Sequence, residues 1–200
     1  MSYLISIVMG YFLGCFQTAY IVARKTKHID IREHGSGNSG TTNAIRVLGW
    51  KLGMLTFVGD ILKAVLAVII ARTLFDSQLA GLYAGAGVVL GHNWPFVLNF
   101  KGGKGIASTL GMLLAFDWRI GLVAWAVASL AIYLTKYVSL GSILLVTIMP
   151  IGVLLLYPGG TQELIITSIL AIIAIYRHKA NIGRLIRGEE NKLGVKKQAT

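Results

Sequence analysis

Residues 35–46 read GSGNSGTTNAIR and form a polar island in a chain that is otherwise mostly apolar. The three glycines in it allow backbone with positive φ and let a ligand approach the peptide N–H groups. A helix that begins near Thr42 would direct its positive end to the same place, and Arg46 would add a full charge. The stretch therefore predicts an anion-binding loop. The same residue types also make ordinary turns, and the Gly-Lys-Ser/Thr ending of a nucleotide-binding P-loop is missing.

The composition around this island is that of an integral membrane protein. Hydrophobic residues make up 55% of the 200 residues, charged residues make up 14%, and mean hydropathy is +0.70, far from the averages of soluble domains. The net charge of +11 is expected on cytoplasmic loops, so no nucleic-acid partner is predicted. The single cysteine, Cys15, excludes a disulfide framework and a cysteine-rich metal site.

Apolar segments long enough to cross a bilayer recur along the chain. A spanning helix needs roughly 20 mostly apolar residues, which predicts an all-α fold with seven transmembrane helices in a single membrane-embedded domain, residues 1–200. The first segment lacks the basic start and the cleavage site of a signal peptide, so it is expected to be retained. The fourth is expected to be a short or tilted helix, or a re-entrant one. The segments are residues 3–23, 53–71, 79–98, 106–116, 119–135, 138–157 and 162–176.

The distribution of basic residues predicts the orientation. Seven spans place the two termini on opposite sides. If the N-terminus is outside, all 19 lysines and arginines lie in cytoplasmic segments except Lys63, Arg72 and Arg119. The positive-inside rule therefore predicts an outside N-terminus and a cytoplasmic C-terminus. The polar segments then share the cytoplasmic face of the cell membrane.

A second polar cluster, GHNWPFVLNFKGGKGIAST, covers residues 91–109. Lys101 and Lys104 flank two glycines, so backbone amides and an ammonium group are again close together. Lys101 is expected to extend to lipid headgroups, whereas Lys104, held between glycines, is expected to bind phosphate. His92 and Asn93 fall within a predicted span, where polar groups usually face a cavity.

The third cluster, RHKANIGRLIRGEENKLG, covers residues 177–194. His178 and Asn181 are three positions apart and would share one helical face below the last span. The basic density of this segment would also suit a tail that lies on anionic lipid. The few carboxylates form no ligand spacing around the histidines, so no metal site is expected.

Two smaller features have simple structural interpretations. Ser139 and Ser142 are typical of a helix N-cap and a small packing residue, and no GxSxG elbow marks either as a nucleophile. Asp60 and Lys63 lie three positions apart within a predicted span, where we expect them to neutralise each other.

Together, GSGNSGTTNAIR, GHNWPFVLNFKGGKG and HKANIGRLIRGEENK resemble, in order and spacing, the motifs of the bacterial acyl-phosphate-dependent glycerol-3-phosphate acyltransferases. The resemblance covers nearly the whole chain. It implies transfer of a fatty acyl group from acyl phosphate to the 1-hydroxyl of glycerol 3-phosphate. The products would be lysophosphatidic acid and inorganic phosphate, in the first acylation of phospholipid synthesis.

The resemblance also implies roles for individual residues. The catalytic residues would be Ser36, Arg46, Lys104, His178 and Asn181. The residues that bind substrate would be Gly37, Asn38, Gly40, Thr41, Asn43, Gly103 and Ser142.

The chemistry of the polar clusters agrees with this activity. Both substrates carry phosphate, and the clusters offer amide nests, one arginine and one lysine on one face. Acyl phosphate is already activated, so no covalent acyl-enzyme and no cofactor are expected. His178 is expected to bind and orient substrate while a phosphate oxygen takes the proton, with His178 as general base kept as the alternative.

The same resemblance implies a set of partners. The acyl chain would lie in a groove between helices that opens to membrane lipid. Acyl-carrier protein and coenzyme A should not be required, and a separate enzyme would supply acyl phosphate.

Two other functions are compatible with parts of the sequence. A small anion transporter would also use glycine-rich segments and basic residues, but the chain shows no inverted repeat. A non-catalytic membrane scaffold would leave the polar residues without a reason to gather on one face.

Overall fold

The computed structural model describes residues 1–194, and these residues form helices and no strands. The helices are α1 (Ser2–Gly14), α2 (Thr18–Lys27), η1 (Ile31–Glu33), α3 (Thr41–Leu48), α4 (Trp50–Phe75), α5 (Gln78–Asn93), η2 (Phe96–Leu98), α6 (Ile106–Phe116), α7 (Trp118–Thr135), α8 (Val138–Leu156), α9 (Thr161–Arg177) and α10 (Lys179–Ile186).

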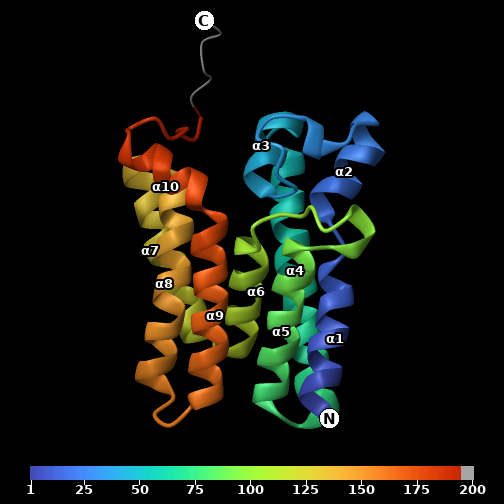
Figure 1. Cartoon of the computed structure of the whole chain (residues 1–200), viewed down its shortest axis with the longest axis vertical. Coiled ribbons are helices and arrows are strands. Elements are labelled where there is room, and N and C mark those ends of the chain that lie inside the picture. Colours follow the sequence, from blue (N-terminus) through green and yellow to red (C-terminus); the bar gives the residue numbers. More distant parts are fainter. Residues whose placement is uncertain (195–200) are drawn as a thin grey trace, which may run out of the picture.

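The long helices run side by side in two groups (Figure 1). Helices α1, α4 and α5 pack together, α7 and α9 each pack on α8, and the short α6 contacts both groups. Helices α2, α3 and α10 lie at one end of the bundle, at the top of Figure 1, and the N-terminus lies at the other end. We call the former the loop end and the latter the opposite end.

Small residues let the helices approach closely. A Cβ on Gly10 of α1 would lie 1.9 Å from the carbonyl oxygen of Ala84 in α5, and a Cβ on Gly111 of α6 would lie 2.4 Å from that of Ile61 in α4. Close backbone approach of this kind is the usual way in which membrane helices pack, because lipid provides no hydrophobic drive for association. The central α6 buries Met112 and Leu113 completely.

The helix lengths do not establish seven spans. Four segments are long and apolar enough to cross a membrane, namely α1 with α2, α4, α7 and α8; α9 and α10, joined at a 59° bend, make a fifth if counted as one span. Helix α5 has 16 residues and α6 has 11, fewer than the roughly 20 that a full span needs. The expectation of a short helix over residues 106–116 is confirmed.

One local expectation is refined and two are wrong. The first predicted span is long enough to cross a membrane, but it consists of two helices, α1 and α2, and Lys63 of α4 donates to the carbonyl groups of Gly14 and Phe16 at the break between them. The third predicted span ends at Asn93 instead of residue 98. Ser139 is not an N-cap: Tyr137 holds that position in α8, and no hydrogen-bond partner for the Ser139 hydroxyl lies within residues 1–194.

Candidate active site

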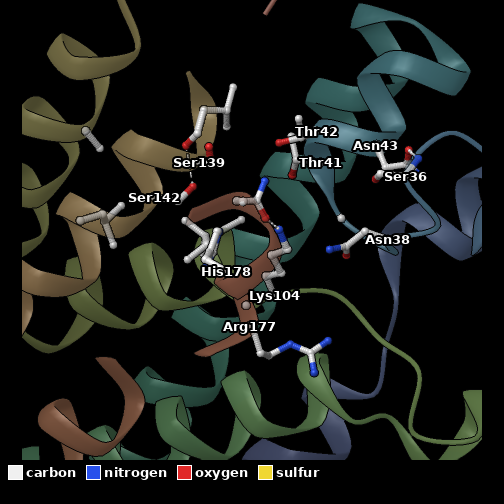
Figure 2. A pocket seen from close by; sticks show the side chains of 18 of the residues that line it. Ser36, Asn38, Thr41, Thr42, Asn43, Lys104, Ser139, Ser142, Arg177 and His178 are labelled. Atoms are coloured by element: carbon white, nitrogen blue, oxygen red, sulfur yellow. Dashed lines mark hydrogen bonds between the residues drawn. The ribbon is translucent and has the colours of Figure 1, made fainter. Parts of the chain in front are cut away.

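A cavity of about 630 Å³ lies toward the loop end (Figure 2). Its walls come from α3 and its preceding loop, from α4 and the end of α5, from the segment before α6, from α6 to α8, and from the junction of α9 and α10. The three polar clusters of the sequence therefore meet around one space, although they are far apart along the chain.

The first wall is a loop braced by Asn43. Its side-chain oxygen accepts from the Ser36 N–H (2.8 Å), and its amide nitrogen donates to the carbonyl groups of Ile31 (3.1 Å) and His34 (2.9 Å). Gly35 has φ +64°, and a Cβ there would lie 2.3 Å from the Asn43 oxygen. A glycine is therefore required where the loop closes on Asn43.

Other polar groups of this loop face the cavity without a partner. The side-chain oxygens of Asn38 and Thr41 are buried and have no hydrogen-bond partner within the described residues. Helix α3 begins at Thr41, so its first N–H groups point into the same region. Thr42 and Arg46 are four positions apart, which places the guanidinium on the cavity side of α3. Buried polar atoms usually have partners, so this wall has the character of a binding surface.

The second wall carries Lys104, which donates a hydrogen bond to the side-chain oxygen of Asn181. Asn181 in turn donates to Glu190 (2.8 Å), and Arg184 donates to the other oxygen of Glu190 (2.8 Å). Burial lowers the pKa of Lys104 to about 8; Glu190 opposes this shift, and the neighbouring arginines add to it. The network holds the ammonium group at the cavity while several positive charges remain in excess.

Arg177 fixes the loop that carries Lys104. Its guanidinium donates to the Gly103 carbonyl (2.6 Å) and lies over the Trp94 ring, 5.2 Å from the centroid. Figure 2 shows Arg177 beside Lys104. The sequence interpretation assigned no role to Arg177, Arg184 or Glu190. Two features of the sequence could have indicated such roles. Arg177 directly precedes His178, and Glu190 is a carboxylate within a basic segment.

His178 lies at the junction of α9 and α10 and lines the cavity. Its Nδ1 donates to the Ala174 carbonyl (2.8 Å), because a carbonyl oxygen can only accept. In the neutral imidazole, Nε2 then carries the lone pair. The ring is therefore held in one orientation and one tautomer, and it can accept a hydrogen bond from a ligand.

An apolar limb extends the cavity between the helices. It is lined by Phe57 of α4, Leu110 of α6, Leu145 of α8 and Trp125 of α7. Trp125 is 48% exposed on the outer surface of the bundle. The cavity thus joins a polar, positively charged chamber to an apolar groove beside the lipid-facing surface.

The structure brings together all of the predicted site residues except two. Gly37 and Gly103 do not line the cavity: Gly37 belongs to a turn beside the Arg32 carbonyl, and Gly103 presents its own carbonyl to Arg177. Asn43 lines it, but its amide is used inside the loop. The residues at the cavity are Ser36, Asn38, Gly40, Thr41, Asn43, Arg46, Lys104, Ser142, His178 and Asn181. Within residues 1–194 there is no group of three or more His, Cys, Asp or Glu residues placed to hold a metal ion.

Comparison with known proteins decides the family. The profile of the family described as glycerol-3-phosphate acyltransferase matches residues 4–188. The chain belongs to this family. A glycerol-3-phosphate acyltransferase from Alkaliphilus metalliredigens is 46% identical over 193 residues, which is 96% of this chain and 97% of that protein. One from Clostridioides difficile is 46% identical over 202 residues, with 98% of each chain covered.

Solved structures of this family have the same fold. The crystal structure of PlsY, an integral membrane glycerol 3-phosphate acyltransferase, in its glycerol 3-phosphate form has a TM-score of 0.88 at 36% identity, with 97% of this chain and 96% of that chain covered. The lysophosphatidic acid form has a TM-score of 0.86 at 34% identity, with the same coverage. The resemblance inferred from the three motifs is confirmed. The prediction of an integral membrane protein is confirmed as well.

Proposed function

We propose that this protein acylates glycerol 3-phosphate at its 1-hydroxyl with acyl phosphate as the donor, and that the cavity is where both substrates bind. The family and the ligands of the two PlsY structures support acylation of glycerol 3-phosphate to lysophosphatidic acid. The observation that carries the choice of donor is the joining of a two-walled cationic chamber to an apolar groove. One phosphate can bind on each wall, and the acyl chain can lie along Leu110, Trp125 and Leu145.

The first wall offers neutral donors and one arginine. Ser36, Thr41 and the start of α3 surround the space beside Arg46. Backbone N–H groups at a helix start and a guanidinium suit a phosphate with several oxygens to satisfy. The second wall offers Lys104, whose ammonium binds phosphate as a point charge, with Asn181 beside it. Two phosphates held this way are positioned without a metal ion.

The reaction then needs little covalent help from the protein. The 1-hydroxyl oxygen attacks the acyl carbonyl carbon, the bond from that carbon to the phosphate oxygen breaks, and inorganic phosphate leaves. The hydroxyl proton passes to a phosphate oxygen. Lys104 and Arg46 stabilise the charge that grows on the carbonyl oxygen and on the departing phosphate. His178 and Asn181 orient the reactants, since the His178 ring is fixed by Ala174.

The same proposal includes seven spans, with the cavity on the cytoplasmic side. Basic residues are concentrated in the loop-end segments, whereas Arg72 and Arg119 lie near the opposite end, as the positive-inside rule expects for an outside N-terminus. A Lys101→Cys variant tests the orientation, because an impermeant thiol reagent should label it only from the cytoplasmic side. Labelling from the outside would contradict it.

The donor is tested with purified protein and labelled glycerol 3-phosphate. Acyl phosphate should give a monoacyl product and inorganic phosphate in equal amounts, with no other factor added. Acyl-coenzyme A and acylated acyl-carrier protein should give none. Product formed from either of these, and not from acyl phosphate, would overturn the proposal. A separate enzyme that makes acyl phosphate is then required upstream.

A further inference from the structure

A cluster of ionisable side chains lies inside the spans, and two of its members, Asp60 and His92, also line the cavity. Asp60 and Lys63 of α4 are 1% and 6% exposed, and His92 of α5 is 3% exposed. Charged groups within a membrane are costly and usually mark a functional site. Asp60 and Lys63, which were expected to neutralise each other, form an ion pair at 2.9 Å, and His92 contacts Lys63 as well.

Lys63 ties this cluster to the break between α1 and α2. Its ammonium contacts the carbonyl oxygens of Gly14 (3.3 Å) and Phe16 (2.7 Å), as well as Asp60 and His92 Nδ1 (2.9 Å). A positive charge at the carbonyl end of α1 is favourable because those carbonyl groups lack helical partners. Thr18, the first residue of α2, donates to Asp60 (3.0 Å). The ammonium is therefore fixed from several sides.

The contact with Lys63 sets the orientation of His92. Because the ammonium donates to Nδ1, the neutral ring carries its proton on Nε2. The Nε2 edge faces Gly103: a Cβ on Gly103 would lie 2.0 Å from Nε2 and 2.9 Å from the Ser39 carbonyl. His92 thus lies where the Ser39 loop meets the Lys104 loop.

The backbone of the Lys104 loop rests directly on His92. Gly103 N–H donates to the His92 carbonyl (3.0 Å), and a Cβ on Gly102 would lie 2.1 Å from that same oxygen. On its other side, the Gly103 carbonyl accepts from Arg177. A segment with two adjacent glycines is held between two fixed groups, and Lys104 is the next residue.

We propose that Lys63 and His92 are positioning residues that set the location of the Lys104 ammonium in the cavity. This inference rests on the proposed role of Lys104 in phosphate binding. Lys63 fixes the orientation of the His92 ring, and the ring fixes the position of the backbone of residues 102–104. A shift of about 1 Å in a reacting or binding group can cost on the order of 10²-fold in rate, so a buried lysine that does not itself line the cavity can control turnover.

The test is a double-mutant cycle on kcat/KM. The combined variant Asp60→Asn/Lys63→Met removes both charges, so that no unpaired charge is left buried. We expect kcat/KM to fall by about 10-fold to 10²-fold in the otherwise native protein. In the Lys104→Ala background the same pair should cost less than about 3-fold, because the group that it positions is gone. Tyr157→Phe, at the opposite end, is the matched control and should leave kcat/KM unchanged in both backgrounds.

His92→Asn provides a second variant if the first does not fold. Asparagine keeps an acceptor near the Nδ1 position and removes the ring edge that supports Gly103. It should also lower kcat/KM, with the loss again absent in the Lys104→Ala background. Thermal unfolding of each variant in detergent separates folding from positioning.

Two results would overturn the inference, and they differ. If the Asp60→Asn/Lys63→Met pair costs nothing, or costs the same factor with and without Lys104, the cluster acts elsewhere and the inference fails alone. If Lys104→Ala itself leaves kcat/KM unchanged, the assignment of Lys104 in the proposed function fails and the inference fails with it.

Discussion

The two ends of the bundle differ in whether their buried polar groups have hydrogen-bond partners, and the opposite end holds a closed network. At the opposite end, Asp117 accepts from Arg119 and from the Tyr157 hydroxyl, which in turn accepts from Gln78. Those contacts join α5, α7 and α8. At the loop end, oxygen atoms of Asn38, Thr41 and Ser139 are buried without partners in the described part of the chain.

This difference separates a structural network from a binding site. A polar group that is satisfied inside the protein stabilises the fold, whereas one left open is costly unless a ligand completes it. Both ends combine carboxylates with basic residues, so charge alone does not distinguish them. The predictions below test this distinction from the largest expected effect to the smallest.

Loss of either cationic group at the loop end should have the largest effect. Arg46→Ala and Lys104→Ala should each lower kcat/KM for acylation by about 10²–10³-fold, because one charge-assisted contact to the developing charge is lost. Lys101→Ala is the matched control, since Lys101 is exposed and does not line the cavity. An equal loss in the control would mean that general basicity, and not the cavity, supports turnover.

The pH profile should show the partial burial of Lys104. Burial lowers the pKa of Lys104 to about 8, so the ammonium loses its proton as pH rises through that value, earlier than an ordinary lysine. We expect kcat/KM to fall above pH of about 8, approaching tenfold per pH unit for loss of a single proton. Initial rates from pH 6 to pH 10 would measure it, and a flat profile to pH 10 would contradict a required ammonium.

The Asn43 side chain, which holds the first loop together, should affect the local stability of that loop more than the rate of acyl transfer. Asn43→Asp keeps the acceptor for Ser36 but replaces the two donated bonds to Ile31 and His34 with repulsion. We expect a loss of about 1–3 kcal/mol in local stability and a raised KM. Hydrogen exchange across residues 31–43 would detect it. Unchanged protection would mean that the loop does not depend on Asn43.

The closed network should affect stability alone. Tyr157→Phe removes the hydroxyl between Gln78 and Asp117, and the Asp117 contact with Arg119 remains. The free energy of unfolding should fall by about 1 kcal/mol, with kcat/KM unchanged. Thermal unfolding and rate assays on one preparation would show it; a rate loss without a stability loss would assign this end a part in turnover.

The sequence predicted the helical membrane fold and most of the cavity because the signals were local. Apolar length marked most of the helices, and the loop before Thr41 carried its own glycines and short polar side chains. Gathering of the clusters on one face followed from the positive-inside pattern. The break after Gly14 was missed because it lies within an apolar run, and the Lys63 side chain that contacts it comes from 49 residues away in the chain.

Burial and pairing were the parts that local pattern did not reveal. Arg177 and Glu190 looked like members of a basic tail, and their roles depend on contacts with Gly103 and Asn181. Asn43 was predicted to bind substrate, but its side-chain amide forms hydrogen bonds within the loop. These outcomes depend on which elements pack together, which periodicity does not encode.

Equilibrium binding of glycerol 3-phosphate most directly tests whether a wall of the cavity holds this substrate. Calorimetric titration would compare the native protein, Arg46→Ala and Lys104→Ala, which alter opposite walls, with Lys101→Ala as the control. Because each wall holds one phosphate, one of the two wall variants should weaken binding by about 10-fold or more, the equivalent of one charge-assisted contact, and the other should weaken it less. If both bind glycerol 3-phosphate as tightly as the native protein does, the cavity is not where this substrate is held.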